Sequence, residues 1–457
     1  MRVINATEPV LIMHENKRIL LINPLDITFF FMHTSNRLPF DLLYIDSYFY
    51  SKGLNTYYLD IGNQRMTKER FGAYIKEISA DYYVINTNGN SFHNRSFFDT
   101  DQHVKDIILC IKDCKPDSFV VLYGQTSTLY PEMYFRFNAD CIIYDEPEYS
   151  MFEIVNKGIK KSSDLKGIRG VYFKNKDKII KNDPRNAMKS LDELPPPRWK
   201  NLGGHFWDST YKEREEFIDI MGMRGCAYGC KFCKSSLSRK VLFHSPAYLL
   251  EQIKILNSDF GYTDFFFRDA GYFDNDLRCQ ELCKGLRQIK GIIWKCNARV
   301  DNMTLDKLKT MKEVGCSLIS YGVESGNEEV LKEINKGIDK KTIINTVAMT
   351  KKVGIKVATY FIVGLPQEGY YKRIKSMIFA KTLNPDILYI SQYYSLDAAE
   401  RFRRSWIKPI RGILDIFLII LFFLGRKRFI IYYCKFRLDR IECNLRNYKI
   451  NKQKLRW

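Results

Sequence analysis

Three cysteines with the spacing Cys-x₃-Cys-x₂-Cys are the residues whose type and spacing could carry chemistry. They are Cys226, Cys230 and Cys233, in the stretch RGCAYGCKFCKSS. Three thiolates this close together can bind three corners of a 4Fe–4S cube, because cysteine sulfur is the usual ligand of such clusters. The fourth iron would keep an open coordination position, which catalysis requires. Gly225 and Gly229 lack a Cβ and let the loop bend around the cube.

Two other interpretations of these cysteines stay open, namely a zinc site and three unrelated buried thiols. A structural zinc site needs a fourth ligand. The nearest candidates are His205 and His244, which lie at no usual zinc-ligand spacing from the cysteines. The pattern therefore favours the iron–sulfur cluster.

The cysteine spacing resembles the signature of the radical S-adenosylmethionine (SAM) superfamily, and the strands that follow resemble that family's partial barrel. In the family the open iron chelates the amino and carboxylate groups of SAM, and electron transfer then releases a 5′-deoxyadenosyl radical. The resemblance implies that Asp269 meets the SAM amino group, that Arg299 points into the barrel mouth and that Glu324 contacts the ribose. Ser325 follows Glu324, and Gly364 belongs to a Gly-Leu-Pro turn that approaches the adenine. An ordinary strand-end salt bridge is the alternative for Asp269 and for Arg299, and no catalytic side chain is identified.

The elements that must position these residues form two α/β domains. Apolar runs such as KRILLIN, ADYYVINTN and SFVVLYG alternate with helical stretches over residues 16–160, which is typical of a doubly wound, Rossmann-like parallel sheet. The alternation resumes over residues 206–395 with six strand-like runs, which predict a partial (β/α)6 barrel. Residues 161–205, with a hairpin-like VYFKNKDKIIK, are interpreted as a linker. An N-terminal extension (1–15) and a helical C-terminal tail (396–457) flank these domains.

The front domain resembles the cobalamin-binding-type half of the radical SAM subclass that includes cobalamin-dependent methyltransferases and the anaerobic magnesium-protoporphyrin cyclase. The match runs through LLINP, RLPFDLLYIDSYFYSKG, LYGQTSTLYPEM and ADCIIYDEPEYS, and through LDELPPPRW in the linker. The usual cobalamin-ligating Asp-x-His-x-x-Gly signature is missing, so cobalamin is expected to bind without a histidine ligand from the protein. The resemblance places Gly124, Thr126 and Ser127 near the nucleotide tail of cobalamin.

Composition and charge indicate the setting in which the chain works. The chain has 457 residues, 12 cysteines and a formal net charge of +20. These cysteines are too sparse for a disulfide scaffold and the start of the chain does not look like a signal peptide, so we expect a reducing cytoplasm. Much of the positive charge lies in residues 401–457, which carry sixteen Lys and Arg side chains against three acidic ones.

Within the basic tail, the apolar stretch GILDIFLIILFFLG (412–425) has basic residues on both sides. At a rise of about 1.5 Å per residue, a helix of this length is too short to cross a hydrocarbon core of about 30 Å. We therefore expect a helix that lies on an anionic membrane surface, at the inner face of the membrane. A core helix packed on the barrel is the alternative.

Together these features favour an enzyme that transfers a methyl group from SAM, through cobalamin, to an unactivated carbon of a small or lipid-like substrate. An oxidative cyclisation or rearrangement on the same fold is the sister hypothesis, and a cluster-binding scaffold without activity is a non-enzymatic alternative. A tRNA methylthiotransferase would need a second cluster from Cys110, Cys114 and Cys141, which are poorly placed for it, so nucleic acid is not expected as a partner. A flavodoxin- or ferredoxin-type reductant is the expected electron donor.

Overall fold

The computed structural model describes residues 18–24, 40–61, 66–87, 97–202, 217–233, 235, 240–269 and 271–393. These residues form two compact units. Unit 1 holds the described residues up to Lys189 together with residues 193–202, and unit 2 holds Ser190–Asp192 and residues 217–393. The extension 1–15 and the tail 396–457 lie outside the described residues. The described helices include none that is long and apolar enough to cross a membrane.

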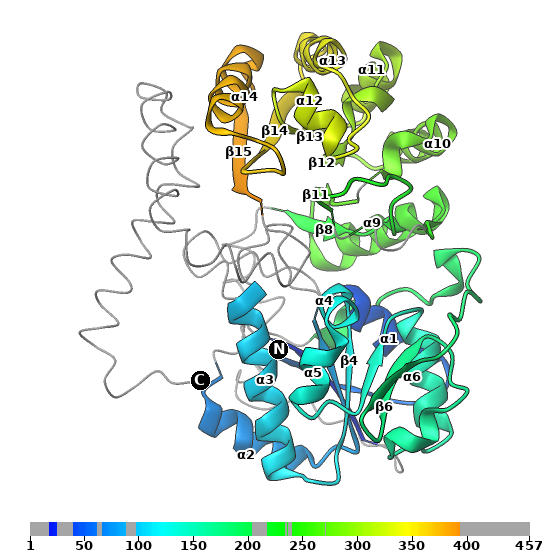
Figure 1. The fold of residues 1–457 in the computed structure, drawn as a ribbon. Helices are drawn as coiled ribbons and strands as arrows, with labels where there is room; N and C mark the ends of the chain where they lie inside the picture. Colours follow the sequence, from blue (N-terminus) through cyan, green and yellow to red (C-terminus); the bar gives the residue numbers. More distant parts are fainter. Residues whose placement is uncertain are drawn as a thin grey trace. The chain divides into compact units, whose positions relative to one another are not determined.

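Unit 1 is built on a seven-stranded sheet (Figure 1). Its strands lie in the order β2-β1-β3-β4-β5-β6-β7; the first five are parallel, and β6 and β7 are antiparallel to their neighbours. The order reverses between β1 and β3, which makes this position the switch point at which doubly wound sheets bind ligands. The strands are β1 (Ile19–Asn23), β2 (Tyr57–Asp60), β3 (Tyr82–Asn86), β4 (Phe119–Tyr123), β5 (Cys141–Ile143), β6 (Val171–Asn175) and β7 (Lys178–Lys181).

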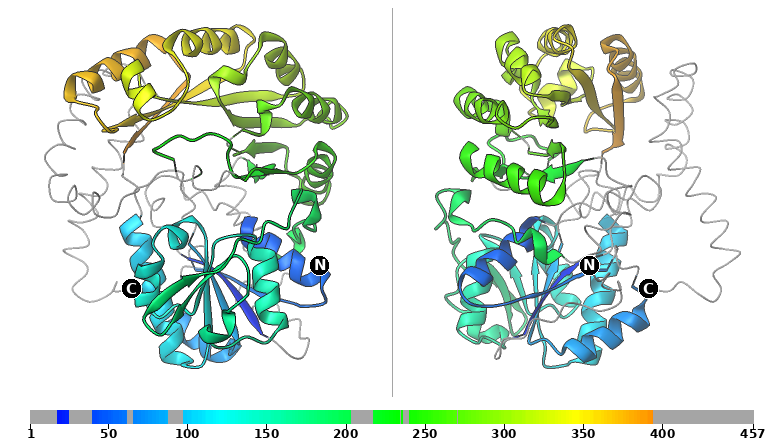
Figure 2. Two further views of the ribbon diagram at one scale, coloured as in Figure 1. Left: turned by 45° about the vertical axis from the view of Figure 1, so that its right-hand side comes forward. Right: turned by 180° about the vertical axis from the view of Figure 1, so that it is seen from behind.

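Helices cover both faces of this sheet (Figures 1 and 2). Successive strand residues point to opposite faces, so Leu20 and Ile22 of β1 pack with helices α2 and α3, whereas Ile19 and Leu21 pack with α1 and α6. All four side chains are fully buried, and each contributes about 1.5–3 kcal/mol of hydrophobic stabilisation. The predicted doubly wound sheet is confirmed, but the sequence does not predict α4, α5 or α6. The helices are α1 (Phe40–Ser51), α2 (Lys68–Ile78), α3 (Phe97–Cys114), α4 (Gln125–Leu129), α5 (Pro131–Arg136) and α6 (Pro147–Asn156), with 3₁₀ turns η2 (Ser162–Leu165) and η4 (Trp199–Leu202).

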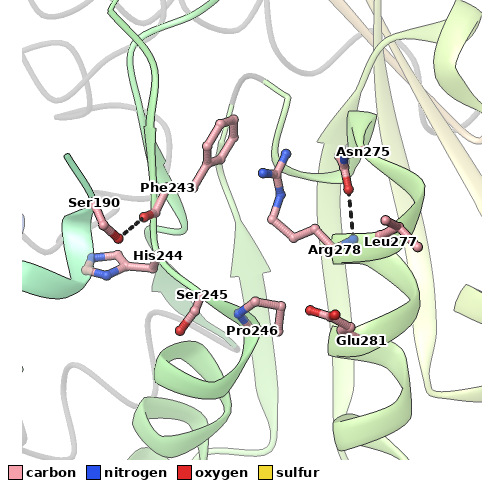
Figure 3. Close-up of a pocket in the computed structure, with 9 residues that line it drawn as sticks. All are labelled: Ser190, Phe243, His244, Ser245, Pro246, Asn275, Leu277, Arg278 and Glu281. Atoms are coloured by element: carbon pink, nitrogen blue, oxygen red, sulfur yellow. Dashed lines mark hydrogen bonds between the residues drawn. The ribbon is translucent and has the colours of Figure 1, made fainter.

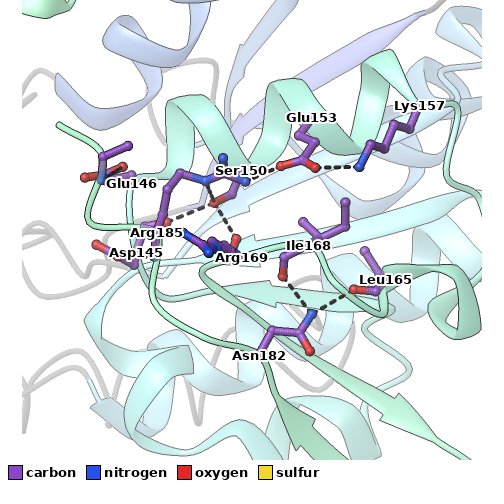
Figure 4. Close-up of polar contacts among 11 residues, drawn as sticks. Asp145, Glu146, Ser150, Glu153, Lys157, Leu165, Ile168, Arg169, Asn182 and Arg185 are labelled. Carbon is purple, nitrogen blue, oxygen red and sulfur yellow. Dashed lines mark hydrogen bonds and ion pairs between the residues drawn. The ribbon is translucent and has the colours of Figure 1, made fainter.

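The hairpin that the sequence places in a linker belongs to the sheet of unit 1, because β6 pairs antiparallel with β5. The chain after the hairpin is fastened to the segment around α6 (Figure 4). The Arg185 backbone N–H donates to Asp145 Oδ2 over 2.8 Å. The Arg185 guanidinium binds Ser150 Oγ and the Glu153 carboxylate. The interpretation of residues 161–205 as a plain linker is therefore corrected, since strand pairing and these polar contacts make much of the segment part of unit 1.

Unit 2 contains a six-stranded, fully parallel sheet with the order β15-β14-β13-β12-β11-β8 (Figures 1 and 2). All six predicted strands are confirmed. In the described part of the chain, β8 and β15 do not pair with each other, so the sheet is open. The strands are β8 (Ile218–Ile220), β11 (Asp264–Phe267), β12 (Ile293–Ala298), β13 (Cys316–Glu324), β14 (Lys356–Val363) and β15 (Ile387–Gln392), with a separate antiparallel pair of β9 (Met223–Arg224) and β10 (Leu242–Phe243).

The helices of unit 2 alternate with the strands, so the loops that follow the strands meet at the carboxyl edge of the sheet, where ligands of parallel α/β sheets bind. Several helices begin at a side-chain cap: Ser245 accepts the Tyr248 N–H at the start of α9, and Asn275 accepts the Arg278 N–H at the start of α10. The helices are α9 (Pro246–Phe260), α10 (Asp276–Leu286), α11 (Leu305–Glu313), α12 (Glu328–Glu333), α13 (Lys340–Lys352) and α14 (Tyr370–Leu383), with 3₁₀ turns η6 (Tyr272–Asp274) and η7 (Val300–Asn302). A further 3₁₀ turn, η3 (Leu191–Glu193), begins in unit 2 and ends in unit 1.

Candidate functional site

The three cysteines lie in one loop that follows β9 at the carboxyl edge of the unit 2 sheet. Gly225 begins this cysteine loop with a φ of +80°, and a Cβ at this position would stand 1.9 Å from the Lys240 carbonyl oxygen. Only glycine tolerates both the backbone conformation and this close approach. Between the last two cysteines the chain turns, because the Cys233 N–H donates to the Cys230 carbonyl oxygen over 3.1 Å. The predicted bend of the loop at Gly225 is therefore present.

The cysteine thiols lie beside two cationic side chains. Cys230 is buried, and Cys226 and Cys233 are half-buried. Burial raises the pKa of the Cys226 and Cys230 thiols, while the nearby Lys336 ammonium and Arg299 guanidinium lower the pKa of Cys230. A positive charge beside a thiol favours the thiolate, which is the form that binds metal.

The chain at the end of α12 holds the cysteine loop from one side. The Lys231 N–H donates to the Ile334 carbonyl oxygen over 3.0 Å. Asn335 Nδ2 donates to the Gly229 carbonyl oxygen, also over 3.0 Å. These two contacts lie on either side of Cys230 and fix its backbone. The sequence predicts no role for this segment, which has the sequence EINKG (333–337).

Arg299 follows β12 and reaches the middle of the cysteine loop. Its guanidinium donates to the two Asp301 carboxylate oxygens over 2.9 and 2.8 Å, and to the Lys336 carbonyl oxygen over 2.9 Å. The guanidinium also lies over the Tyr228 ring, 3.8 Å from its centroid. The salt bridge considered as the alternative for Arg299 is therefore present, with Asp301 as the partner. A contact of Arg299 with SAM stays a prediction.

Glu324 and Lys336 form a buried ion pair beside the loop. Glu324 ends β13 with a φ of +67°, an unusual conformation for a residue with a side chain. Its Oε1 lies 2.9 Å from Lys336 Nζ, and both side chains are less than one tenth exposed. Unusual backbone conformations that the surroundings enforce cluster at functional sites. Sequence reasoning identifies Glu324 but misses Lys336. The only hint of Lys336 in the sequence is that it is the basic residue of the segment EINKG.

Asp269 lies just beyond β11, at the root of the cysteine loop. Its carboxylate accepts the Gly222 N–H over 2.9 Å and the Met223 N–H over 3.0 Å. Burial raises the pKa of Asp269 from its ordinary value of 3.8 to about 7, and the two backbone donors lower it only in part. Asp269 therefore fixes the chain that leads into the cysteines, and a contact with the SAM amino group stays a prediction.

Ser325 and Gly364 belong to two turns that one buried network joins. Ser325 Oγ lies 3.0 Å from Ser376 Oγ, and Ser376 Oγ donates to Glu368 Oε1 over 3.4 Å. The Gly364 N–H donates to Glu368 Oε2 over 2.6 Å. Burial raises the pKa of Glu368 to about 7. The network positions both turns that the resemblance assigns to SAM, and sequence reasoning misses Glu368 and Ser376.

A zinc site has less support than a cluster. Among the described residues, no three His, Cys, Asp or Glu side chains converge on a position for a single metal ion. Thiolates that hold a cube bind different irons, so they need not converge in this way. His244 instead lies with its Nδ1 3.1 Å from Asp192 Oδ1, and its ring stacks on Tyr248 with centroids 4.0 Å apart. The donor set fits a 4Fe–4S cluster better than zinc, and the assignment of the cysteines stays a prediction.

A pocket of about 320 Å³ lies at the amino ends of α9 and α10 (Figure 3). Ser190 Oγ donates to the Phe243 carbonyl oxygen over 3.2 Å, and Asp192 Oδ1 accepts the Ser245 N–H over 2.9 Å. The Arg278 guanidinium lies 3.5 Å from the centroid of the Phe243 ring. Asp192 thus already places a carboxylate at the positive end of α9. Because no cysteine lines this pocket, we assign it no ligand.

The carboxyl edge of the unit 1 sheet holds the residues predicted to approach cobalamin. Gly124 follows β4 with a φ of +123°. Thr126 and Ser127 are buried. Ser127 Oγ donates to the Gly124 carbonyl oxygen over 3.2 Å and accepts from Thr87 Oγ1 over 2.8 Å. These hydroxyl contacts join the ends of β3 and β4, and a contact with cobalamin stays a prediction.

The comparisons with known proteins agree with this arrangement. Residues 220–378 match the family model of the radical SAM superfamily. The chain is 31% identical over 281 residues to the uncharacterized methyltransferase PH0819 of Pyrococcus horikoshii. The aligned region covers 60% of this chain and 60% of that protein. The chain spans less than two thirds of the length of the first curated relatives that it matches.

Two solved structures share the fold. The radical SAM methyltransferase TsrM from Kitasatospora setae matches with a TM-score of 0.67 at 15% identity, over 82% of this chain and 73% of that chain. The cobalamin-dependent SAM radical enzyme OxsB matches with a TM-score of 0.68 at 17% identity, over 96% of this chain and 62% of that chain. Residues 220–378 therefore match a radical SAM domain, and the chain shares its fold with TsrM and with the cobalamin-dependent enzyme OxsB.

Proposed function

We propose that the chain is a cobalamin-dependent radical SAM methyltransferase that methylates an unactivated carbon of a small molecule. The observation that carries this proposal is the presence, in one chain, of a three-cysteine loop at the carboxyl edge of one parallel sheet and a front sheet of strand order β2-β1-β3-β4-β5. The methyltransferase names of PH0819 and TsrM support the same reaction class.

The cysteine loop would hold the 4Fe–4S cluster through Cys226, Cys230 and Cys233. Such a cluster supplies the electron that cleaves SAM and releases the 5′-deoxyadenosyl radical. The chain itself keeps the three thiols in place through Gly225 and the end of α12. The Lys336 ammonium lowers the pKa of Cys230 and so favours its thiolate, and it would offer a positive charge to the SAM carboxylate.

The residues that the resemblance assigns to SAM would act from the neighbouring loops. Asp269 would face the SAM amino group while its backbone contacts hold the root of the cysteine loop. Glu324, with one oxygen on Lys336, would offer its other oxygen to a ribose hydroxyl. Ser325 and Gly364 would shape the ribose and adenine sides through their turns.

Cobalamin would bind at the carboxyl edge of the unit 1 sheet, near the switch point between β1 and β3. Gly124 at the end of β4 would allow a close approach of the cofactor. The buried side chains of Thr126 and Ser127 would stabilise the turn that carries Gly124. We expect no histidine ligand from the protein.

The partners follow from the reaction class and from charge. A low-potential flavodoxin- or ferredoxin-type protein would supply electrons. The basic tail would bind an anionic membrane at the cytoplasmic face, which would suit a lipid-like substrate.

The front cysteines argue against a tRNA methylthiotransferase. Cys110 packs in the core on the α2 and α3 face of the unit 1 sheet, whereas Cys141 packs in the core on the α1 and α6 face. The sheet therefore separates these two thiols. A second cluster held by Cys110, Cys114 and Cys141 would require the sheet to open.

Anaerobic reconstitution with iron, sulfide and hydroxocobalamin tests the proposal. The protein is expected to retain both the cluster and the cobalamin absorption bands through gel filtration, and to produce 5′-deoxyadenosine from SAM on reduction. The variant with Cys226, Cys230 and Cys233 all changed to Ala should keep cobalamin and lose SAM cleavage. A protein that emerges without cobalamin bands would contradict the cobalamin assignment. A product that lacks the SAM methyl group would favour the cyclisation or rearrangement hypothesis.

A further inference from the structure

The phenol of Tyr228, in the middle of the cysteine loop, is held by two polar side chains from other segments. Tyr228 Oη donates to Asp274 Oδ2 over 2.9 Å, and Asn302 Nδ2 donates to Tyr228 Oη over 2.6 Å. Asp274 ends the turn η6 after β11, and Asn302 ends the turn η7 after β12. The loop is thereby tied to the two neighbouring strands through one aromatic side chain.

A buried lysine fixes the two turns that carry these groups. Lys307 Nζ donates to the Phe273 carbonyl oxygen over 3.0 Å and to the Asn302 carbonyl oxygen over 2.7 Å. Its charge is balanced by Asp276, whose Oδ1 lies 2.5 Å away. The Asp274 carboxylate is therefore held on a rigid support.

The charges around the cysteine loop leave Asp274 without an ion pair. Arg299 is committed to Asp301, and Lys336 is committed to Glu324. Among the described residues, no lysine or arginine forms an ion pair with Asp274, which is instead held by the neutral Tyr228 phenol. The Arg299 and Arg278 guanidinium groups attract the Asp274 carboxylate from a longer range, and the carboxylate acts in turn on the Cys226 thiol.

A carboxylate beside a cluster makes the addition of an electron less favourable, because net charge and hydrogen bonds near the cluster set its reduction potential. We propose that the Asp274 carboxylate, held against Tyr228, keeps the reduction potential of the iron–sulfur cluster low. This inference rests on the proposed function, which places the cluster on the cysteine loop. A low potential is needed because the electron must pass to the sulfonium of SAM.

The test is an anaerobic redox titration of the reconstituted full chain, followed by electron paramagnetic resonance of the reduced cluster. Asp274→Asn keeps an oxygen that can accept the Tyr228 hydrogen bond and removes the charge, so the midpoint potential should become less negative. Tyr228→Phe leaves the charge in place and removes the hydrogen bond, so the potential should not become less negative. Asp306→Asn removes a charge that is 95% exposed and serves as the matched control, with no shift expected.

The outcomes separate this inference from the proposed function. An Asp274→Asn protein with an assembled cluster and an unchanged midpoint potential would overturn the inference. An upward shift in Tyr228→Phe would overturn it as well, because loop position rather than charge would then set the potential. A natural chain that assembles no cluster at all would instead refute the proposed function.

Discussion

Replacement of Gly225 by Ala should prevent assembly of the cluster while leaving both units folded. The Cβ would stand 1.9 Å from the Lys240 carbonyl oxygen, whereas real Cβ contacts stay above 3.0 Å, so the two backbone segments must separate by more than 1 Å. A φ of +80° adds about 1–2 kcal/mol for a residue with a Cβ. The separation of these two segments also breaks backbone hydrogen bonds between β9 and β10, and each lost bond costs about 1 kcal/mol of stability. With one or two ladder hydrogen bonds lost, the local cost is roughly 2–4 kcal/mol.

The assay is iron content and visible absorption after anaerobic reconstitution, together with thermal unfolding. Gly291→Ala is the matched control, because Gly291 has a φ of +76° and no atom lies within 4 Å of the position that its Cβ would take. We expect Gly291→Ala to bind iron as the natural chain does, with only a small fall in unfolding temperature. Gly225→Ala should lose most of its iron. Equal iron content in the two variants would refute the geometry described for the start of the cysteine loop.

Three further predictions concern charge. Lys336→Met should lower the free energy of unfolding of unit 2 by about 3–5 kcal/mol, because it leaves the buried Glu324 without its partner. Thermal unfolding would show this loss. A second substitution, Glu324→Gln, should restore part of the lost stability. The raised pKa of Asp269 means that its contribution to stability is complete below pH 3.8 and is lost as the pH rises through about 7. The stability advantage of the natural chain over Asp269→Asn should therefore shrink between pH 5 and pH 8, by up to about 1.4 kcal/mol per pH unit; a constant difference in unfolding midpoint would contradict this. The full chain should sediment with anionic vesicles, less so at high salt, whereas a chain ending before Arg401 should not; equal binding to neutral vesicles would favour a core helix.

The strands and the cysteine loop could be predicted because their signals are local. A buried parallel strand is a continuous apolar run, and KRILLIN, ADYYVINTN and the six runs of unit 2 each gave a strand. Helices α4 and α5 have five and six residues, which is too few turns for a periodic apolar pattern to appear. The pair β9 and β10 is shorter still, with two residues in each strand.

The contacts of the site could be predicted less well, because they join residues that are distant in the chain. The sequence identifies Asp269 as an acid at a strand end but does not show that Gly222 and Met223 donate to it from 47 and 46 residues away. It identifies Glu324 but not the lysine that comes 12 residues later. Residue types predict the chemistry of a site, whereas the partners depend on how the strands are brought together.

Ser190–Asp192 belongs to unit 2 although the chain on either side belongs to unit 1. The strands of unit 1 all precede residue 182, so its sheet can form while the ribosome is still synthesising unit 2. Asp192 is then already present when Ser245, made 53 residues later, brings the first turn of α9 to it. Docking of α9 on a carboxylate that was synthesised earlier therefore gives unit 2 a fixed position from which its sheet can form. A chain begun after Asp192 would have to start that helix without it.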